Sequence, residues 1–350
     1  MVLSYYLIKI PYSITWSVLN MLGKTDDVML YCANTLDYHI FSEVQRHLPK
    51  VSVLAKNKKV QQQLRDIGVE AKVYPAFPKA VIMCRQAGYK FPTSKITKIG
   101  MRHGPYTFKP FANAKGYNLL DYFYMTSEDE VERAQKAGIR CGVAKGYPKL
   151  DPALNGQHDS DFKQQLKQRI GFDNDKPTIL FTATWDKSMV SAIKLWFDQL
   201  DAFTELYNVL VTVHPWTSDT IKKRIKSYAD VFFIDSPDVV PYIGISDVCI
   251  GDTSSILAEC CALNKPMVTF KVADGKRTVP HVKELIAHFS IQIERIDELA
   301  DAIEQALCDP PSLQQGRQTA NQIMFDLLDG KAGLRTAEHI KQVVPYLTED

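Results

Sequence analysis

The feature of this sequence that most constrains its fold is a repeated alternation of short apolar runs with helical stretches. In the first half, apolar runs occupy residues 28–32, 51–54, 71–74 and 119–125, with weaker runs at 81–84 and 96–101. In the second half they occupy residues 178–182, 209–213, 231–234, 248–250 and 267–270. Strands that alternate with helices form parallel sheets covered by crossover helices, so the sequence predicts an α/β fold.

A polar segment interrupts this alternation in the middle of the chain. Residues 148–177 include PKLDPALNGQHDSD and GFDNDKP, and this content of Pro, Gly, Asn and Asp is typical of a linker. The length of 350 residues corresponds to about two domains. The sequence therefore predicts an N-terminal segment (1–25), an N-terminal α/β domain (26–150), a linker region (151–177) and a C-terminal α/β domain (178–345).

Charge and cysteine content narrow the classes of protein. Lys plus Arg number 42 against 40 for Asp plus Glu, without a long basic run, so the sequence predicts no nucleic-acid partner. Seven cysteines without a CxxC pair fit the reduced thiols of a cytoplasmic protein. The motifs GxGxxG, GxSxG and the P-loop are absent, and no Cys/His cluster has metal-ligand spacing. We therefore expect neither a metal nor a cofactor.

The N-terminal segment predicts an amphipathic helix. Residues 5–22 form the most apolar long stretch, but Lys9, Pro11 and several polar residues make it too polar to span a bilayer. On a helix, Lys9, Ser13, Ser17, Asn20 and Lys24 share one stripe, opposite Ile10, Ile14, Val18 and Leu22. The aromatic residues Tyr5, Tyr6, Tyr12 and Trp16 are of the kind found at bilayer interfaces. Two interpretations stay open: packing on its own domain, and attachment to a membrane surface.

The clearest local signal for chemistry is GDTSSILAEC, residues 251–260. A buried strand runs into a turn that contains Asp252, Thr253, Ser254 and Ser255, and a helical stretch follows. Hydroxyl groups and free backbone N–H groups at such a position can bind a phosphate. The alternative is that Asp252 or Thr253 is only the N-cap of the helix, but capping needs one such residue and the chain supplies several.

Two histidines lie where strands are expected to end. His103 follows an apolar stretch in KIGMRHGPY, and His214 follows the strand of VLVTVHPWT. An imidazole titrates near neutrality and can transfer a proton or hold a phosphate by a hydrogen bond or a charge. A single histidine is more often structural, but two at strand ends in opposite halves support one another. The sequence therefore predicts His103 and His214 as catalytic residues.

Several stretches between residues 100 and 335 have counterparts, in the same order, in one family. His103-Gly104-Pro105 looks like a His-Gly-Thr-Pro motif, 146–151 (GYPKLD) like Gly-Tyr-Pro-Arg-x-Asp, and 183–186 (ATWD) like Pro-Thr-Trp-Arg. Residues 212–215 (TVHP) look like the family's Arg-x-His-Pro motif. Residues 246–255, with Lys265-Pro266 after them, look like its Ser-Asp-x-x-Ile-x-Asp-Tyr-Ser-Ser stretch and Lys-Pro turn. The family's closing Asp-Gly-Lys-Ala is present at residues 329–332. Together they resemble the CDP-glycerol:poly(glycerophosphate) glycerophosphotransferases of teichoic-acid and capsule synthesis. The chain departs from the family pattern at Asp186, where Arg is usual, and at Thr253, where Tyr is usual.

The resemblance implies a GT-B fold, in which two Rossmann-like domains face a central nucleotide cleft. It implies transfer of a polyol phosphate, first of all glycerol phosphate, from a CDP-linked donor to a hydroxyl of a cell-surface glycan or lipid-linked acceptor, with release of CMP. His103 would be the base, and His214 with Asp252, Thr253, Ser254 and Ser255 would hold the donor phosphates. Gly146, Tyr147, Pro148 and Thr184 would shape the nucleotide side at the hinge.

A lipid-linked acceptor would suit a cytoplasmic enzyme held at the inner face of the plasma membrane. Two other interpretations stay open. The first is another GT-B enzyme, either a nucleotide-sugar glycosyltransferase or a UDP-sugar 2-epimerase. The second is a non-catalytic module that binds a nucleotide or a glycan.

Overall fold

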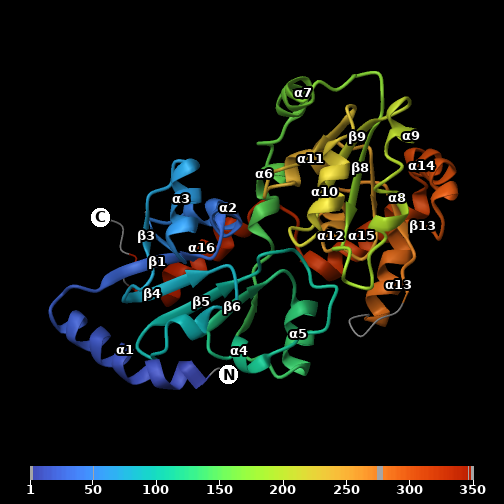
Figure 1. The fold of residues 1–350 in the computed structure, drawn as a ribbon. Coiled ribbons are helices and arrows are strands. Elements are labelled where there is room, and N and C mark those ends of the chain that lie inside the picture. Colours follow the sequence, from blue (N-terminus) through green and yellow to red (C-terminus); the bar gives the residue numbers. More distant parts are fainter. Residues whose placement is uncertain (1–2, 50, 274–278, 346, 348–350) are drawn as a thin grey trace. The chain divides into compact units, whose positions relative to one another are not determined.

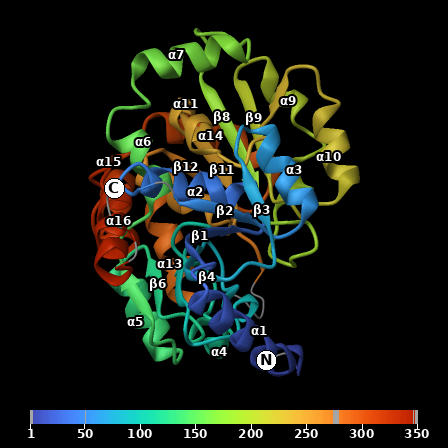
Figure 2. The same ribbon diagram turned by 90° about the vertical axis from the view of Figure 1, so that its left-hand side faces the viewer.

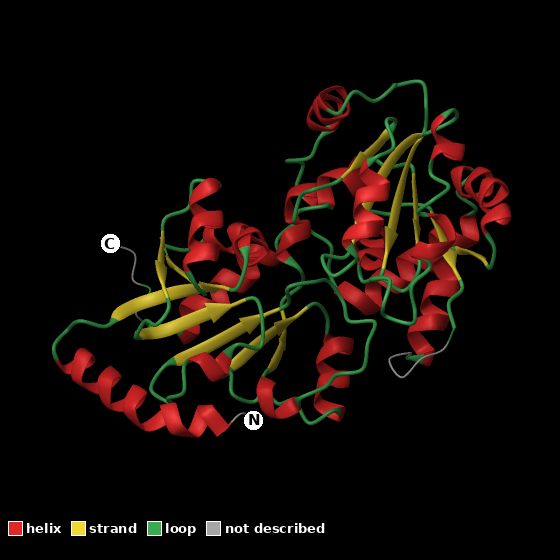
Figure 3. Cartoon of the chain, viewed as in Figure 1, coloured by secondary structure: helices red, strands yellow, loops and turns green. Residues whose placement is uncertain are grey.

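The computed structural model describes residues 3–49, 51–273, 279–345 and 347, and for residues 3–6 it describes the backbone alone. All strand pairs in the described part of the chain are parallel, and helices cover both faces of the sheets (Figures 1 and 3). The chain divides into two compact units. Unit 1 comprises residues 1–103, 111–151 and 329–350, and unit 2 comprises residues 104–110 and 152–328. The predicted α/β class is confirmed.

Unit 1 contains a seven-stranded sheet in the order β3-β2-β1-β4-β5-β6-β7. Its strands are β1 (Asp26–Cys32), β2 (Ser52–Ala55), β3 (Ala71–Val73), β4 (Pro78–Met83), β5 (Thr97–Met101), β6 (Tyr122–Met125) and β7 (Gly142–Ala144). One face packs on α2 (Thr35–Gln45), α3 (Lys58–Asp66) and α16 (Ala332–Val343). The other face packs on α1 (Leu3–Met21), α4 (Ala114–Tyr117) and α5 (Glu128–Lys136). The short 3₁₀ helices η1 (Gly88–Lys90) and η2 (Pro148–Leu150) complete the unit.

Unit 2 contains a six-stranded sheet in the order β10-β9-β8-β11-β12-β13. Its strands are β8 (Thr178–Ala183), β9 (Asn208–Val213), β10 (Val231–Phe233), β11 (Val248–Gly251), β12 (Met267–Phe270) and β13 (Ile291–Ile293). Its helices are α7 (Ser160–Arg169), α8 (Ile193–Trp196), α9 (Asp201–Thr204), α10 (Asp219–Lys226), α11 (Val240–Ile245), α12 (Ile256–Ala262), α13 (Pro280–Phe289), α14 (Leu299–Leu307) and α15 (Pro311–Phe325), with η3 (Ile296–Glu298) before α14. The short α6 (Asp151–Leu154) lies where the chain leaves unit 1.

Helix α16 belongs to unit 1, although all of unit 2 separates it in the sequence from the other helices there. Figures 1 and 2 show this red helix beside the blue α2. Ala337 and Ile340 of α16 are fully buried in the same core as Ile40 and Phe41 of α2. The Asp151 carboxylate accepts hydrogen bonds from the backbone at the start of α16, at 2.7 and 3.1 Å. The sequence predicted residues 178–345 as one C-terminal domain, whereas the structure places α16 in unit 1. There α16 packs on the apolar face of the sheet that also contacts α2 and α3.

Helix α15 contacts α13 at very short range. A Cβ atom added at Gly316 of α15 would lie 1.9 Å from the carbonyl oxygen of His288 in α13. The neighbouring Arg317 is fully buried, and one of its terminal nitrogens donates to both carboxylate oxygens of Asp309, at 2.7 and 2.8 Å. Its Nε donates to the side chain of Asn264 at 2.8 Å. Glycine at position 316 therefore permits the close contact between α15 and α13, and Arg317 ties α15 to Asp309 and Asn264, which lie outside α13.

Helix α1 packs on unit 1 through its aromatic residues. The Tyr12 hydroxyl donates to the carbonyl of Ala76 at 2.6 Å, and the Trp16 indole donates to that of Pro78 at 2.7 Å. Both rings are buried, so the suggestion that they lie at a bilayer interface is wrong. The corresponding suggestion for Tyr5 and Tyr6 concerns side chains outside the described part. Among the described residues, no helix has the length and hydropathy needed to cross a membrane.

The aliphatic residues of α1 point the other way. Leu7, Ile8, Ile10, Ile14, Val18 and Met21 are 48 to 82% exposed, together with Leu22 just after the helix. Soluble surfaces rarely expose so many large aliphatic side chains side by side. The interpretation that this segment packs on its own domain is confirmed, and its aliphatic face remains uncovered in the described chain.

Candidate functional site

The loop that follows β11 is organised around a buried carboxylate. Asp252 is 1% exposed and accepts hydrogen bonds from the backbone and hydroxyl of Thr184, the backbone of Ala192, and the backbones of Thr253 and Ser254, at 2.5 to 3.1 Å. Burial raises the pKa of the Asp252 carboxyl, and the hydrogen bonds from Ala192 and Thr184 oppose that shift. The carboxylate therefore ties the loop after β8 to the loop after β11, its neighbour in the sheet.

This geometry gives Asp252 and Thr184 roles other than those the sequence predicted. A carboxylate with its lone pairs occupied by five donors has no means of binding a phosphate directly, and both donors of Thr184 point at that carboxylate. The backbone N–H groups of Thr253 and Ser254 also point at Asp252, and the Thr253 hydroxyl donates to the carbonyl of Val190 at 3.4 Å. Asp252 and Thr184 thus position the loop, in which Ser254 is half-buried and Ser255 is exposed.

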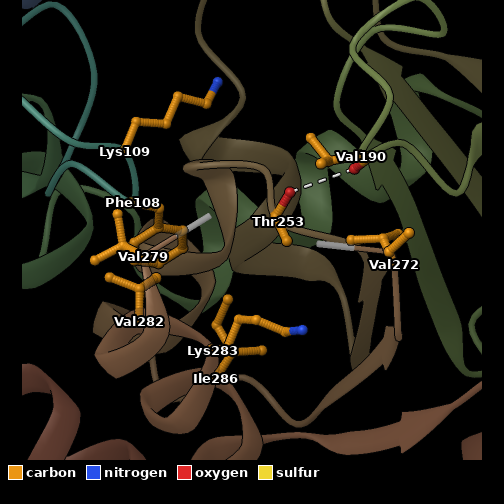
Figure 4. Close-up of a pocket in the computed structure, with 10 residues that line it drawn as sticks. Phe108, Lys109, Val190, Thr253, Val272, Val279, Val282, Lys283 and Ile286 are labelled. Carbon is orange, nitrogen blue, oxygen red and sulfur yellow. Dashed lines mark hydrogen bonds between the residues drawn. The ribbon is translucent and has the colours of Figure 1, made fainter. Parts of the chain in front are cut away.

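The segment from Gly104 to Pro110 lies against this loop in unit 2. A Cβ atom at Gly104 would be 3.8 Å from the hydroxyl oxygen of Ser255. Further along the segment, Phe108 and Lys109 line a pocket with Thr253, Val190 and Lys283, drawn in Figure 4. A neighbouring pocket of about 320 Å³ shares the side chains of Thr253 and Lys283. The loop of residues 252–255, hereafter the serine loop, therefore borders two pockets that lysine side chains also line.

His214 lies at the carboxyl end of β9, on the other side of β8 from the serine loop. The backbone N–H of Trp216 donates to its Nδ1 at 3.1 Å, so in the neutral imidazole the proton resides on Nε2. Burial, with the charges of Lys109 and Lys222, lowers the pKa of His214 to about 4. At neutral pH the side chain is then an uncharged imidazole that can donate a hydrogen bond from Nε2.

Three aromatic rings meet beside this histidine. The Trp185 centroid lies 5.0 Å from that of His214 and 5.4 Å from that of Trp216, and the His214 and Trp216 centroids are 5.2 Å apart. The ammonium group of Lys109 lies 4.8 Å from the centroid of Trp185, a cation–π distance. Asp186, which replaces the family's usual arginine, accepts a hydrogen bond from the backbone of Ser218 at 3.0 Å. That bond ties the loop after β8 to the loop after β9.

The remaining predicted residues lie in unit 1. His103 follows β5, is exposed, and is preceded by Arg102, whose Nε lies 3.4 Å from a carboxylate oxygen of the buried Glu130. Tyr147 and Pro148 are buried, and Gly146 has φ +85° with no room for a Cβ atom, which would meet Ala332 at 2.9 Å. The 146–148 turn therefore shapes unit 1 by packing and offers no ring or hydroxyl at its surface.

The structure thus brings together Thr184, His214 and residues 252–255 at the carboxyl edge of one sheet, and adds Lys109 and Trp216, which the sequence did not single out. Lys109 had one visible signal, its place just after the His-Gly motif. Trp216 had only its place two residues after His214. Within the described residues, no group of three or more His, Cys, Asp or Glu side chains is placed to hold a metal ion.

Comparison with known proteins identifies relatives of the chain. Residues 106–342 match the sequence model of the family described as CDP-glycerol:poly(glycerophosphate) glycerophosphotransferase. The teichoic acid ribitol-phosphate polymerase TarK of Staphylococcus aureus is 25% identical over 51% of this chain and 36% of its own length. The teichoic acid poly(ribitol-phosphate) polymerase of Bacillus spizizenii is 24% identical over 71% of this chain and 41% of its own length. The chain spans about a third of the length of the first curated relatives it matches.

Solved structures show the same fold. A structure of the wall teichoic acid polymerase TagF matches with a TM-score of 0.69 and 15% identity, over 97% of this chain and 98% of that chain. A UDP-GlcNAc 2-epimerase from Neisseria meningitidis, bound to UDP-GlcNAc, matches with a TM-score of 0.61 and 15% identity, over 91% of this chain and all of that one. These similarities confirm the predicted GT-B fold with two Rossmann-like halves.

Proposed function

The chain belongs to the CDP-glycerol:poly(glycerophosphate) glycerophosphotransferase family, and we propose that it transfers a polyol phosphate from a CDP-linked donor to an acceptor hydroxyl, releasing CMP. The observation that carries this is the carboxyl edge of β9, β8 and β11 in unit 2. There an uncharged N–H donor, two serine hydroxyls and a nearby lysine lie on loops that are hydrogen-bonded to one another. Such fixed donors suit the phosphates of a nucleotide.

The proposed reaction is a displacement at phosphorus. The acceptor oxygen forms a bond to the phosphorus that carries the polyol, the bond from that phosphorus to the oxygen of CMP breaks, and CMP leaves with that oxygen. His103 takes the proton of the acceptor hydroxyl. His214 donates from Nε2 to a donor phosphate, as do the hydroxyls of Ser254 and Ser255, while Asp252 and Thr184 hold the loop in place.

The acceptor is proposed to be a cell-surface glycan on a lipid carrier, and the glycerol unit is the first candidate for the transferred group. The names of the relatives support a polyol phosphate as the transferred group, since these proteins are polymerases or transferases of glycerol phosphate or ribitol phosphate in teichoic acid synthesis. The exposed aliphatic face of α1 supports attachment to the inner face of the plasma membrane, where such an acceptor is anchored. Unit 1 would then carry the acceptor and unit 2 the donor.

The donor is tested by incubating the protein with CDP-glycerol, CDP-ribitol or UDP-N-acetylglucosamine and a lipid-linked acceptor, and by measuring released CMP or UDP. We expect CMP release from a cytidine donor, a loss of at least tenfold with Ser255→Ala, and unchanged release with Ser160→Ala, an exposed serine of the same unit. His103→Ala should abolish transfer and leave donor affinity unaltered. Turnover of the uridine donor in preference would instead favour a glycosyltransferase or an epimerase.

Membrane attachment has its own test. Ile10→Lys with Ile14→Lys places two charges on the exposed aliphatic face of α1 and should release the protein from vesicles that contain anionic lipid. Asn20→Lys, at an exposed position on the polar stripe of the same helix, is the matched control and should stay bound. Equal sedimentation of both variants with the vesicles would contradict the attachment.

A further inference from the structure

The indole ring of Trp216 lies beside the proposed donor-phosphate site and is exposed to solvent, which is unfavourable for the stability of the fold. Trp216 is 71% exposed, and among the described residues of unit 2 no other Phe, Tyr or Trp side chain is classed as exposed. Indole rings are normally buried for most of their surface, because exposing them to water is unfavourable. This ring lies two residues beyond His214, at the carboxyl edge of the sheet.

The loop that carries the ring is held by bonds that do not involve the ring itself. The backbone N–H of Trp216 donates to His214, and that of Thr217 donates to the carbonyl of His214 at 2.9 Å. Lys222 donates to the carbonyl of Pro215 at 2.7 Å, and Thr217 is 2% exposed. The inner edge of the indole packs at 76° on Trp185. The loop backbone is therefore held in place before any ligand arrives, and the indole contacts the rings of Trp185 and His214.

We propose that the indole of Trp216 stacks on the pyrimidine base of the donor nucleotide, an inference that rests on the proposed function. Every nucleobase offers a flat π face, and stacking on an aromatic side chain is its usual apolar contact. The phosphates of the same nucleotide would lie at His214, in ring contact with Trp216, and near Lys109. The turn at residues 146–148, predicted from the sequence to shape the nucleotide side, has its Tyr147 ring buried in unit 1. Trp216 supplies the ring surface that this turn lacks.

The side chain can be removed without dismantling the phosphate site. The bond that fixes the His214 tautomer comes from the backbone of residue 216, so Trp216→Ala keeps it. Trp216→Phe keeps a π face as well. Leu206→Ala removes another large exposed apolar side chain, 63% exposed, from the same unit and serves as the control.

The test measures the affinities of CDP and of inorganic pyrophosphate for all four proteins by calorimetry. We expect Trp216→Ala to weaken CDP by roughly 5- to 150-fold and to bind pyrophosphate as the wild type does, since only CDP carries a base. Trp216→Phe should retain most of the CDP affinity, and Leu206→Ala all of it. In the wild type, CDP should also protect tryptophan fluorescence from acrylamide, and pyrophosphate should not.

Two outcomes would overturn the inference, and they are distinguishable. If Trp216→Ala binds CDP as tightly as the wild type, the base lies elsewhere and the proposed function still stands. If CDP and pyrophosphate bind to none of the four proteins, the proposed donor site itself fails and the stacking role with it.

Discussion

The role of Asp252 as the tie between two loops can be tested by replacing one oxygen atom. In Asp252→Asn, the amide oxygen can take the place of Oδ1, which accepts from Thr184, Thr253 and Ser254. The amide NH₂ then faces the backbone N–H groups of Ala192 and Thr184, which both donate to Oδ2 at 3.0 Å in the native chain. Thr184 keeps its bond to the oxygen at the Oδ1 position, and Ala192 loses its acceptor. One charge-assisted bond, worth about 1.5–3 kcal/mol, is lost, and a buried N–H is left unsatisfied at a cost of about 1–3 kcal/mol.

Part of this loss is offset, because a neutral amide is cheaper to bury than a carboxylate. The net decrease in the free energy of unfolding is then about 2–4 kcal/mol, which for a unit of this size corresponds to a fall in Tm of roughly 5–15 °C. Scanning calorimetry with near-UV circular dichroism measures it, and Asp230→Asn, an exposed aspartate of the same unit, should leave Tm within about 1 °C of the wild type. If Asp252→Asn melts with the wild type, the buried carboxylate does not hold the loops.

Three further outcomes are expected. Gly316→Ala should lower the free energy of unfolding by roughly 2–3 kcal/mol, and Tm by more than about 5 °C, because its methyl group would overlap the carbonyl of His288. A melting curve like the wild type's would contradict this contact. Since the pKa of His214 falls from 6.5 to about 4 on folding, its contribution to stability is complete above pH 6.5 and is lost as the pH falls toward 4. Urea titrations of the wild type and His214→Asn should therefore converge at the acid end. Arg317→Lys removes the buried Nε–H donor to Asn264 and leaves a single nitrogen to contact Asp309, and should cost about 2–3 kcal/mol by urea unfolding. Arg295→Lys, at an exposed ion pair, should have no measurable effect.

Strands that carry an apolar run, even a weak one, were predictable from the sequence, and strands without such a run were not. The runs at 81–84 and 96–101 correspond to β4 and β5, shifted by a few residues. Strands β7 and β13 were missed, because neither has an apolar run: β7 begins with glycine, and Gln292 interrupts β13. Their pairing with β6 and β12 makes them strands, and such pairing cannot be seen in a local pattern.

In the candidate site, too, some features were predictable from the local sequence and others were not. The cluster of hydroxyls after β11 and the position of His214 followed from local sequence alone. The inward turn of Asp252 did not, because its partners Thr184 and Ala192 are 68 and 60 residues away along the chain. The exposure of Trp216 could not be predicted from the sequence either, since a tryptophan that follows a strand can be buried or exposed. Local patterns find residue types suited to chemistry, and long-range contacts decide which way they point.

The return of α16 to unit 1 has a consequence for how the protein is made. Translation proceeds from the N-terminal side of a chain to the C-terminal side, so every residue of unit 2 is synthesised before the helix that covers one face of the unit 1 sheet. Until α16 emerges, the apolar side chains around Ile40 and Phe41 lack their partner. The unit that begins first is therefore completed last. Its uncovered sheet face needs protection during synthesis, and we expect a chain cut before residue 332 to be rescued by an added peptide that carries α16.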